Sequence, residues 1–213
     1  MTGVKSVMIV GVCGQGSLLA SKLLGNVLMA QGHDVKVSEV HGMSQRGGSV
    51  VTYVRYGDRV YSPIVARGEA DAIVSFERLE AARWLPYLKQ GGRLIVNDQR
   101  ISPMPVITGT MEYPADIIEK LRGKGADVVA CDALALAGQA GSAKAVHAAL
   151  MGVPSTLLDI PEAVWQAALE ACVPPKFLEL NKKAFALGRA YRYTENLKPK
   201  GSNTIGKLLP ARN

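Results

Sequence analysis

The 213-residue chain has few cysteines, no long apolar run, and no basic and apolar leader of the kind that directs secretion. Its three cysteines, Cys13, Cys131 and Cys172, lie far apart and form no C-x-x-C pair, which excludes a zinc site or iron–sulfur cluster recognisable from the sequence. No apolar run approaches about 18 residues, so no membrane-spanning helix is expected. We therefore expect a cytoplasmic protein whose thiols are reduced.

The excess of basic residues does not resemble a nucleic-acid-binding surface. The formal net charge is +7, but Lys and Arg are scattered apart from a mild gathering near the C-terminus. No aromatic-rich motif accompanies them, and an acidic ligand or partner protein explains the charge equally well. We therefore expect no nucleic-acid partner. A hydrophobic share of 48% in a chain of this length is typical of a globular protein with a substantial core.

The opening stretch predicts a strand, a turn and a helix. Residues 7–10 are apolar, as in a strand buried on both faces, and apolar residues recur at helical spacing over 18–29. In a doubly wound α/β fold, ligands lie at the carboxyl ends of such strands, and a glycine-rich turn before a helix suits an anion. The alternative is that the glycines only allow a tight turn and close packing. The expected cofactor-binding residues are Gly11, Gly14, Gln15, Gly16 and Ser17.

This turn departs from the dinucleotide-binding pattern at one position. In the G-x-G-x-x-G frame, Gly11 and Gly16 occupy the first and third positions, but Cys13 occupies the second. Its side chain would crowd a pyrophosphate. Glu39, at the end of the next expected strand, could still bind the ribose, so a stand-alone NAD(P)-binding dehydrogenase remains an alternative.

The rest of the chain predicts a Rossmann-like, doubly wound α/β fold with a mostly parallel sheet, an antiparallel hairpin and a helical C-terminal part. The hairpin is expected over residues 49–62, with its turn at Gly57-Asp58. We expect a domain over 1–193 and a polar, basic tail over 194–213. Further strands are expected at 35–40, 70–76, 94–97 and 127–131, and helices at 77–88 (ended by Gly91-Gly92), 114–122, 132–139, 142–151, 161–171 and 175–193.

A second loop, between residues 41 and 48, holds the candidate catalytic residues Arg46 and His41. Arg46 precedes Gly47 and Gly48, whose exposed backbone donors, together with the guanidinium, suit a carboxylate or phosphate. His41 could move protons near neutral pH. The alternatives are a surface salt bridge for Arg46 and an ordinary hydrogen-bonded histidine at position 41.

The two motifs together resemble a known family. Gly11-Val-Cys-Gly-Gln-Gly16, followed by Glu39-Val-His-Gly-Met-Ser-Gln-Arg-Gly-Gly48, is similar to the gamma subunits or domains of 2-oxoacid:acceptor oxidoreductases, the indolepyruvate type in particular. The similarity runs from about residue 4 to 193 and includes Asn181-x-x-Ala184-x-x-x-Gly188. Two positions depart from the family: Cys13 replaces a glycine, and His147 replaces a common asparagine.

This resemblance implies one subunit of a thiamine-dependent enzyme that oxidatively decarboxylates a 2-oxo acid such as indolepyruvate. Coenzyme A would take the acyl group, and ferredoxin the electrons. The chain has no G-D-G motif with a distant asparagine and no cysteine cluster, so this chain alone is expected to bind no cofactor. Thiamine diphosphate, Mg²⁺ and iron–sulfur clusters are expected on a larger alpha subunit. A pyruvate/ketoisovalerate-type gamma subunit and a noncatalytic scaffold subunit remain alternatives.

Overall fold

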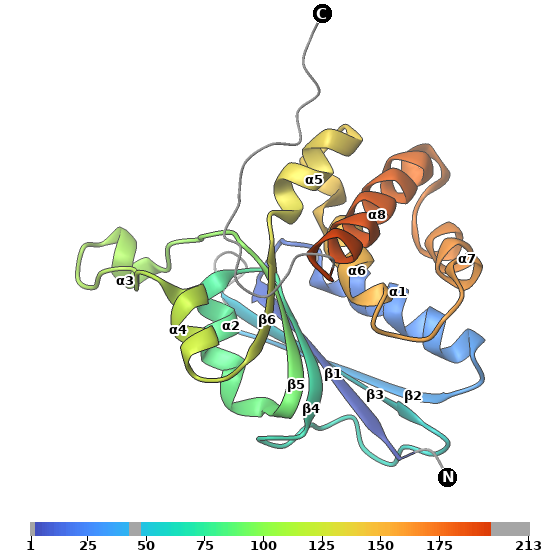
Figure 1. The fold of residues 1–213 in the computed structure, drawn as a ribbon, viewed down its shortest axis with the longest axis horizontal. Helices are drawn as coiled ribbons and strands as arrows, with labels where there is room; N and C mark the ends of the chain where they lie inside the picture. Colours follow the sequence, from blue (N-terminus) through green and yellow to red (C-terminus); the bar gives the residue numbers. More distant parts are fainter. Residues whose placement is uncertain (1–2, 43–47, 197–213) are drawn as a thin grey trace, which may run out of the picture.

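A six-stranded sheet with helices on both faces forms the protein (Figure 1). The computed structural model describes residues 3–42 and 48–196, with side chains described up to residue 191. The strand order is β2-β3-β1-β4-β5-β6; β1, β4, β5 and β6 are parallel, and β3 runs antiparallel to both of its neighbours. The predicted mixed, mostly parallel fold is confirmed. The strands are β1 (Lys5–Val12), β2 (Asp34–His41), β3 (Ser49–Gly57), β4 (Ala70–Ser75), β5 (Leu88–Asn97) and β6 (Asp127–Cys131).

Strand β1 is buried on both faces, as its apolar run predicts. Successive side chains of a strand point to opposite faces. Accordingly, Ile9 joins the hydrophobic cluster on one side of the sheet, whereas Met8 and Val10 join the cluster on the other side. Every residue of β1 after Lys5 is buried.

Helices cover the two faces unequally. Helices α1 and α5–α8 pack on one face, and α2 and α4 on the other (Figure 1). No helix in the described part of the chain is long and apolar enough to cross a membrane. The helices are α1 (Ser17–Ala30), α2 (Arg78–Trp84), α3 (Met104–Ile107), α4 (Ile117–Gly123), α5 (Ala133–Ala140), α6 (Val146–Ser155), α7 (Glu162–Cys172) and α8 (Pro175–Asn196), with short 3₁₀ turns η1 (Leu85–Tyr87) and η2 (Ala143–Ala145).

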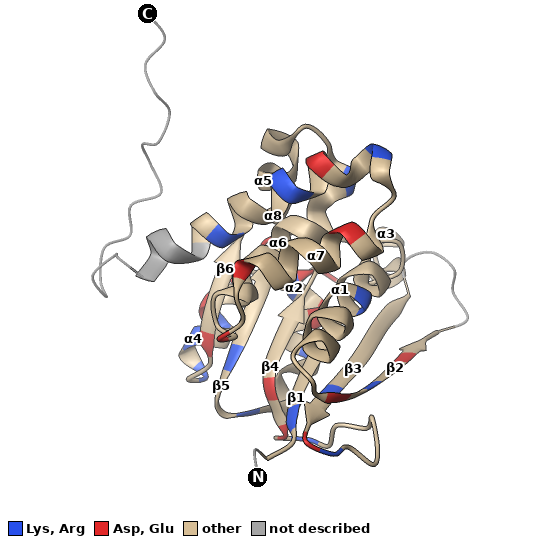
Figure 2. Ribbon diagram, turned by 90° about the vertical axis from the view of Figure 1, so that its right-hand side faces the viewer, with Lys and Arg blue, Asp and Glu red and all other residues tan. Residues whose placement is uncertain are grey.

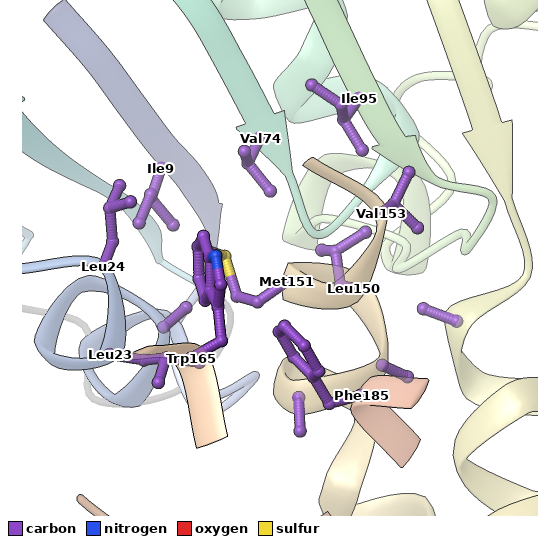
Figure 3. Packing of buried hydrophobic residues seen from close by; sticks show 14 of the residues in the cluster. Ile9, Leu23, Leu24, Val74, Ile95, Leu150, Met151, Val153, Trp165 and Phe185 are labelled. Carbon is purple, nitrogen blue, oxygen red and sulfur yellow. The ribbon is translucent and has the colours of Figure 1, made fainter. Parts of the chain in front are cut away.

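The larger helical layer is held by close backbone contact and aromatic packing. A Cβ on Gly188 would lie 1.8 Å from the carbonyl oxygen of Ala149, so α8 and α6 touch through their backbones. The rings of Trp165 in α7 and Phe185 in α8 have centroids 5.4 Å apart and are tilted by 32°. They lie on the side of the sheet where Ile9, Val74 and Ile95 join the same cluster (Figure 3). Only glycine permits this helix crossing, which explains Gly188 in the C-terminal family pattern.

One expected strand is wrong, and one expected helix ends earlier than predicted. Within the described residues, 59–62 form no strand, and β3 instead pairs with β2 and β1. The Asp34 carboxylate, at the start of β2, accepts the N–H of Val60 at 2.8 Å, so this segment is bonded to the end of β2 and not paired along β3. The helix expected over 77–88 ends at Trp84 with a 3₁₀ turn, and Gly91-Gly92 lies inside β5. Gly92 passes close to the neighbouring strand, because a Cβ there would lie 3.0 Å from Ala70 O.

Charged residues of both signs are interspersed over the elements. Blue and red segments alternate along β2 and across the helices in Figure 2. This matches the scattered arrangement in the sequence. The helix expected over 175–193 extends to Asn196, and residues 197–213 of the expected tail lie outside the described residues.

Candidate functional site

The sheet topology places a switch point between the carboxyl ends of β1 and β4. These strands are parallel neighbours, but β1 leads to α1 on one face and β4 leads to α2 on the other. Such a switch point is where doubly wound folds bind ligands. Here the backbone N–H of Phe76, just after β4, donates to the Val10 carbonyl at 2.8 Å.

Gln15 closes the glycine-rich turn with its own side chain. Its Oε1 accepts the Val12 N–H at 2.8 Å, and its Nε2 donates to the Phe76 carbonyl at 2.9 Å. The same Nε2 lies 3.3 Å from Gln99 Oε1. The Gln15 amide, expected to bind a cofactor, therefore ties β1 to the end of β4.

The three glycines of this turn that were expected to bind a cofactor have different surroundings. A Cβ on Gly11 would lie 2.9 Å from the Phe76 Cβ, and one on Gly16 would lie 3.1 Å from the His147 Cβ. Gly16 also has φ = 91° and precedes α1 without a side-chain cap. These two positions favour the packing alternative. Gly14 has φ = 95° and open space where its Cβ would be, so its backbone is accessible to a ligand or partner.

The structure joins the two sequence motifs at one edge of the sheet. The Cys13 N–H donates to the Gly48 carbonyl at 2.9 Å. His41 pairs with Val50, and Val50 pairs with Gly11, so His41 lies two strands, about 10 Å, from the glycine turn. Arg46 and Gly47, which the sequence assigned to this site, lie outside the described residues.

Two buried glutamates at the start of α2 fix the surrounding loops. The Ser49 hydroxyl, directly after the 42–48 loop, donates to Glu80, which also receives Arg83 Nε at 3.0 Å. Glu77 accepts the backbone N–H of Ile101 at 3.1 Å and the Tyr113 hydroxyl at 2.5 Å. These donors compensate the buried carboxylates. Burial and the bond to Glu77 raise the pKa of Tyr113, which keeps its hydroxyl a donor.

Asn97 and Gln99 complete an amide cluster at the same edge. Asn97 Nδ2 donates to the Phe76 carbonyl and to Gln99 Oε1, both at 3.1 Å. Its Oδ1 accepts the Ala133 N–H at 3.0 Å and so fixes the start of α5. Sequence reasoning missed Asn97, Gln99, Glu77 and Glu80, although polar residues directly after the apolar strand 94–96 are a usable signal.

The topology weakens the dinucleotide alternative. Glu39 lies on β2, and β3 separates β2 from β1. Its carboxylate accepts the Thr52 hydroxyl at 3.2 Å. An acid two strands away from the glycine turn is poorly placed for a ribose whose pyrophosphate lies at that turn.

Comparison with known proteins agrees with the sequence motifs. The sequence model of the family described as pyruvate ferredoxin/flavodoxin oxidoreductase matches residues 6–191. The indolepyruvate oxidoreductase subunit IorB of Thermococcus kodakarensis is 42% identical over 188 residues, covering 86% of this chain and 93% of that protein. The subunit of the same name from Pyrococcus horikoshii is 41% identical over 191 residues.

Solved structures share the fold. The gamma subunit of keto/oxoacid ferredoxin oxidoreductase from Geobacter sulfurreducens superposes with a TM-score of 0.67 at 21% identity, over 89% of this chain and 99% of that chain. The 2-oxoglutarate:ferredoxin oxidoreductase of Magnetococcus marinus, solved with 2-oxoglutarate, coenzyme A and succinyl-CoA, gives 0.68 at 17% identity. The match covers 91% of this chain but 32% of that one, so the shared fold is one part of a longer chain.

Proposed function

The chain belongs to the pyruvate ferredoxin/flavodoxin oxidoreductase family, and on this premise we propose that it is the small subunit of an indolepyruvate:ferredoxin oxidoreductase. The complex would oxidatively decarboxylate an aryl 2-oxo acid, transfer the acyl group to coenzyme A and pass the electrons to ferredoxin. The observation that carries this proposal is the 42% identity to an indolepyruvate oxidoreductase subunit along 93% of its length. The family match over 6–191 supports 1–193 as the domain and 194–213 as a tail.

We place the redox groups on a larger alpha subunit. The three cysteines of this chain do not fit a cluster, because Cys13 lies in the glycine turn, Cys131 at the end of β6 and Cys172 at the end of α7. Thiamine diphosphate, with its Mg²⁺, would supply the decarboxylation chemistry from that partner. Free thiols are typical of a reducing compartment, so we propose that the complex works in the cytoplasm.

This chain would contribute the carboxyl edge of its sheet to the shared site. The 42–48 loop is anchored at its end by Gly48, bonded to the Cys13 N–H, and by Ser49, bonded to Glu80. The Arg46 guanidinium, two residues before Gly48 in the sequence, would bind the carboxylate of the 2-oxo acid or a phosphate of coenzyme A. His41 would accept or donate a proton at the same edge.

Reconstitution with the alpha subunit tests the proposal. Indolepyruvate, pyruvate and ketoisovalerate are compared as substrates in a coenzyme A-dependent assay that follows ferredoxin reduction. We expect turnover with indolepyruvate only when both subunits are present, and none from this chain alone. Preference for pyruvate or ketoisovalerate would assign the other substrate type. Full activity of the alpha subunit alone would make this chain a scaffold, and micromolar NAD binding by calorimetry would favour a dehydrogenase.

A further inference from the structure

The segment between β5 and α4 forms an arm that stands away from the rest of the molecule. This arm, residues 101–113, follows β5, forms the short helix α3 and returns to the chain just before α4. Figure 1 shows α3 apart from the sheet and from the helices that cover the sheet. Every residue of α3 is exposed or only partly buried. Tyr113, at the base of the arm, is the residue through which it packs on a hydrophobic cluster of the described chain.

The tip of the arm presents apolar side chains to the solvent. Met104, Ile107 and Met111 are each 64–65% exposed. Met104 and Ile107 are three residues apart in α3 and therefore lie on one face of it. The Met111 N–H donates to the Pro105 carbonyl at 3.0 Å, which brings Met111 back beside α3. Residues 101–111 carry no charged side chain. Apolar side chains that gather in this way on a surface mark an interaction site, whereas scattered single ones do not.

Hydrogen bonds within the arm fix the shape of its tip. The Pro105 carbonyl accepts both the backbone N–H and the hydroxyl of Thr110, each at 2.9 Å. The Ile107 N–H donates to the Pro103 carbonyl at 3.0 Å. The rings of Pro103 and Pro105 restrict the backbone at the start of α3 as well. A segment that already holds one shape loses little conformational entropy when it binds, so this tip is organised for binding before a partner arrives.

A buried carboxylate holds the two ends of the arm together. Glu77 is buried, and its carboxylate accepts the Ile101 N–H at 3.1 Å and the hydroxyl of Tyr113. The Arg100 guanidinium lies over the Tyr113 ring, 4.4 Å from its centroid. Burying a carboxylate is costly unless donors compensate it, and here both ends of the arm supply them. Glu77 directly follows Phe76, so the arm is attached to the carboxyl edge of the sheet.

We infer that the arm docks on the larger alpha subunit and places its three apolar side chains in an uncharged recess of that partner. The inference rests on the proposed function, which supplies the partner. The place of the arm supports this choice, because the Phe76 carbonyl beside Glu77 accepts hydrogen bonds from Gln15 and Asn97 of the candidate site. An alpha subunit that covers this edge reaches the arm without a break in the interface. Methionine side chains are unbranched and adapt to an irregular apolar surface.

The strength of assembly with the alpha subunit tests the inference. The double variant Met104→Ser with Ile107→Ser removes apolar groups from the tip and leaves the bonds of Glu77 intact. We expect its Kd for the alpha subunit, measured by biolayer interferometry, to rise at least about tenfold, because burial of one large apolar side chain is worth about a decade in affinity. Met29→Ser is the matched control, since Met29 is 55% exposed at the end of α1 remote from the glycine turn. It should change the Kd less than about twofold.

Two further measurements separate docking from catalysis and from effects of the variants on folding. At saturating concentrations the double variant should reach the turnover of the unmodified complex, and only the concentration needed for half-maximal turnover should rise. Lower turnover at saturation would place the tip in the active site and overturn the inference. Hydrogen exchange needs no variant: the amides of residues 104–111 in the unmodified chain should exchange more slowly once the alpha subunit is bound, and unchanged exchange there would also overturn it.

Two other outcomes would count against the inference. One is an equal loss of affinity in the double variant and in Met29→Ser. The other is an isolated chain that self-associates in sedimentation through the tip, with unchanged affinity of the double variant for the alpha subunit, which would make a second copy the partner. The inference and the proposed function also fail separately. Tight assembly and indolepyruvate turnover by the double variant sink only the inference, whereas assembly that depends on the tip without indolepyruvate turnover sinks only the function.

Discussion

Replacing Gln15 by leucine distinguishes a structural clamp from a ligand-binding residue. The Gln15 amide joins three groups: the Val12 N–H, the Phe76 carbonyl and the Gln99 side chain. Leucine has a similar size but no hydrogen-bonding group. We therefore expect Gln15→Leu to lower the stability of the isolated chain, before any ligand or partner is added.

The expected loss of stability in Gln15→Leu depends on which groups bonded to Gln15 still have another hydrogen bond. The Phe76 carbonyl retains its bond from Asn97 Nδ2 at 3.1 Å, so it stays satisfied. The Val12 N–H, by contrast, loses its acceptor, the Gln15 Oε1 at 2.8 Å, inside a buried strand. An orphaned buried donor costs about 1–3 kcal/mol. In a chain of this size, each kcal/mol lowers Tm by about 2–4 °C.

Thermal and urea unfolding of the isolated chain measure this loss. Gln15→Glu is a useful second variant, because a carboxylate still accepts the Val12 N–H but places an oxygen against the Phe76 carbonyl and Gln99 Oε1. It should also destabilise the chain. Gln139→Leu, at an exposed position of α5, is the control and should change stability by less than about 0.5 kcal/mol.

One outcome would refute the clamp. If Gln15→Leu unfolds like the unmodified chain but the reconstituted complex loses activity, Gln15 acts on a ligand, as the sequence first suggested. Loss of stability with normal activity at low temperature would confirm the clamp.

Three further predictions follow from other positions. Gly188→Ala should destabilise the chain by about 1–3 kcal/mol or more, because the new Cβ would collide with the Ala149 carbonyl oxygen. Gly138→Ala in α5 has open space for its Cβ and should stabilise the chain by about 0.5–1 kcal/mol. Urea unfolding of both variants measures the contrast. Arg46→Ala should leave unfolding unchanged but lower the turnover of the complex at least about tenfold, and unchanged kinetics at saturating partner would make it a surface residue. Burial lowers the folded pKa of His147 below 6.5, so the unfolded chain takes up the proton first and stability should fall as pH drops through about 6.5. His147→Phe should flatten that part of the stability–pH profile, and an unchanged slope would contradict the assignment.

The sequence alone was sufficient for the fold class and the family. The apolar run at 7–10 predicts a strand buried on both faces, and β1 is such a strand. The two glycine motifs indicated the family that the comparisons show. These features are local, since a few adjacent residues determine the backbone conformation of a strand or a glycine turn.

Strand pairing required the tertiary structure. The sequence suggested that β3 would turn back on residues 59–62, but β3 inserts between β2 and β1. The apolar residues of β3 are compatible with pairing to several other strands, and the periodicity of a strand does not determine which strand it pairs with. The bond that the Val60 N–H instead donates to Asp34 joins residues 26 positions apart, beyond any local pattern.

The roles of individual site residues were likewise decided by contacts between distant segments. Gly11 and Gly16 are glycines because Phe76 and His147 pack against them. The Gln15 amide is engaged in a hydrogen bond within the protein, because the Phe76 carbonyl lies directly after the neighbouring strand β4. The sequence determines which residues can adopt a tight turn or donate a hydrogen bond. Only the packed sheet decides which distant atom each one meets, because strands far apart in the sequence become neighbours only when the chain folds.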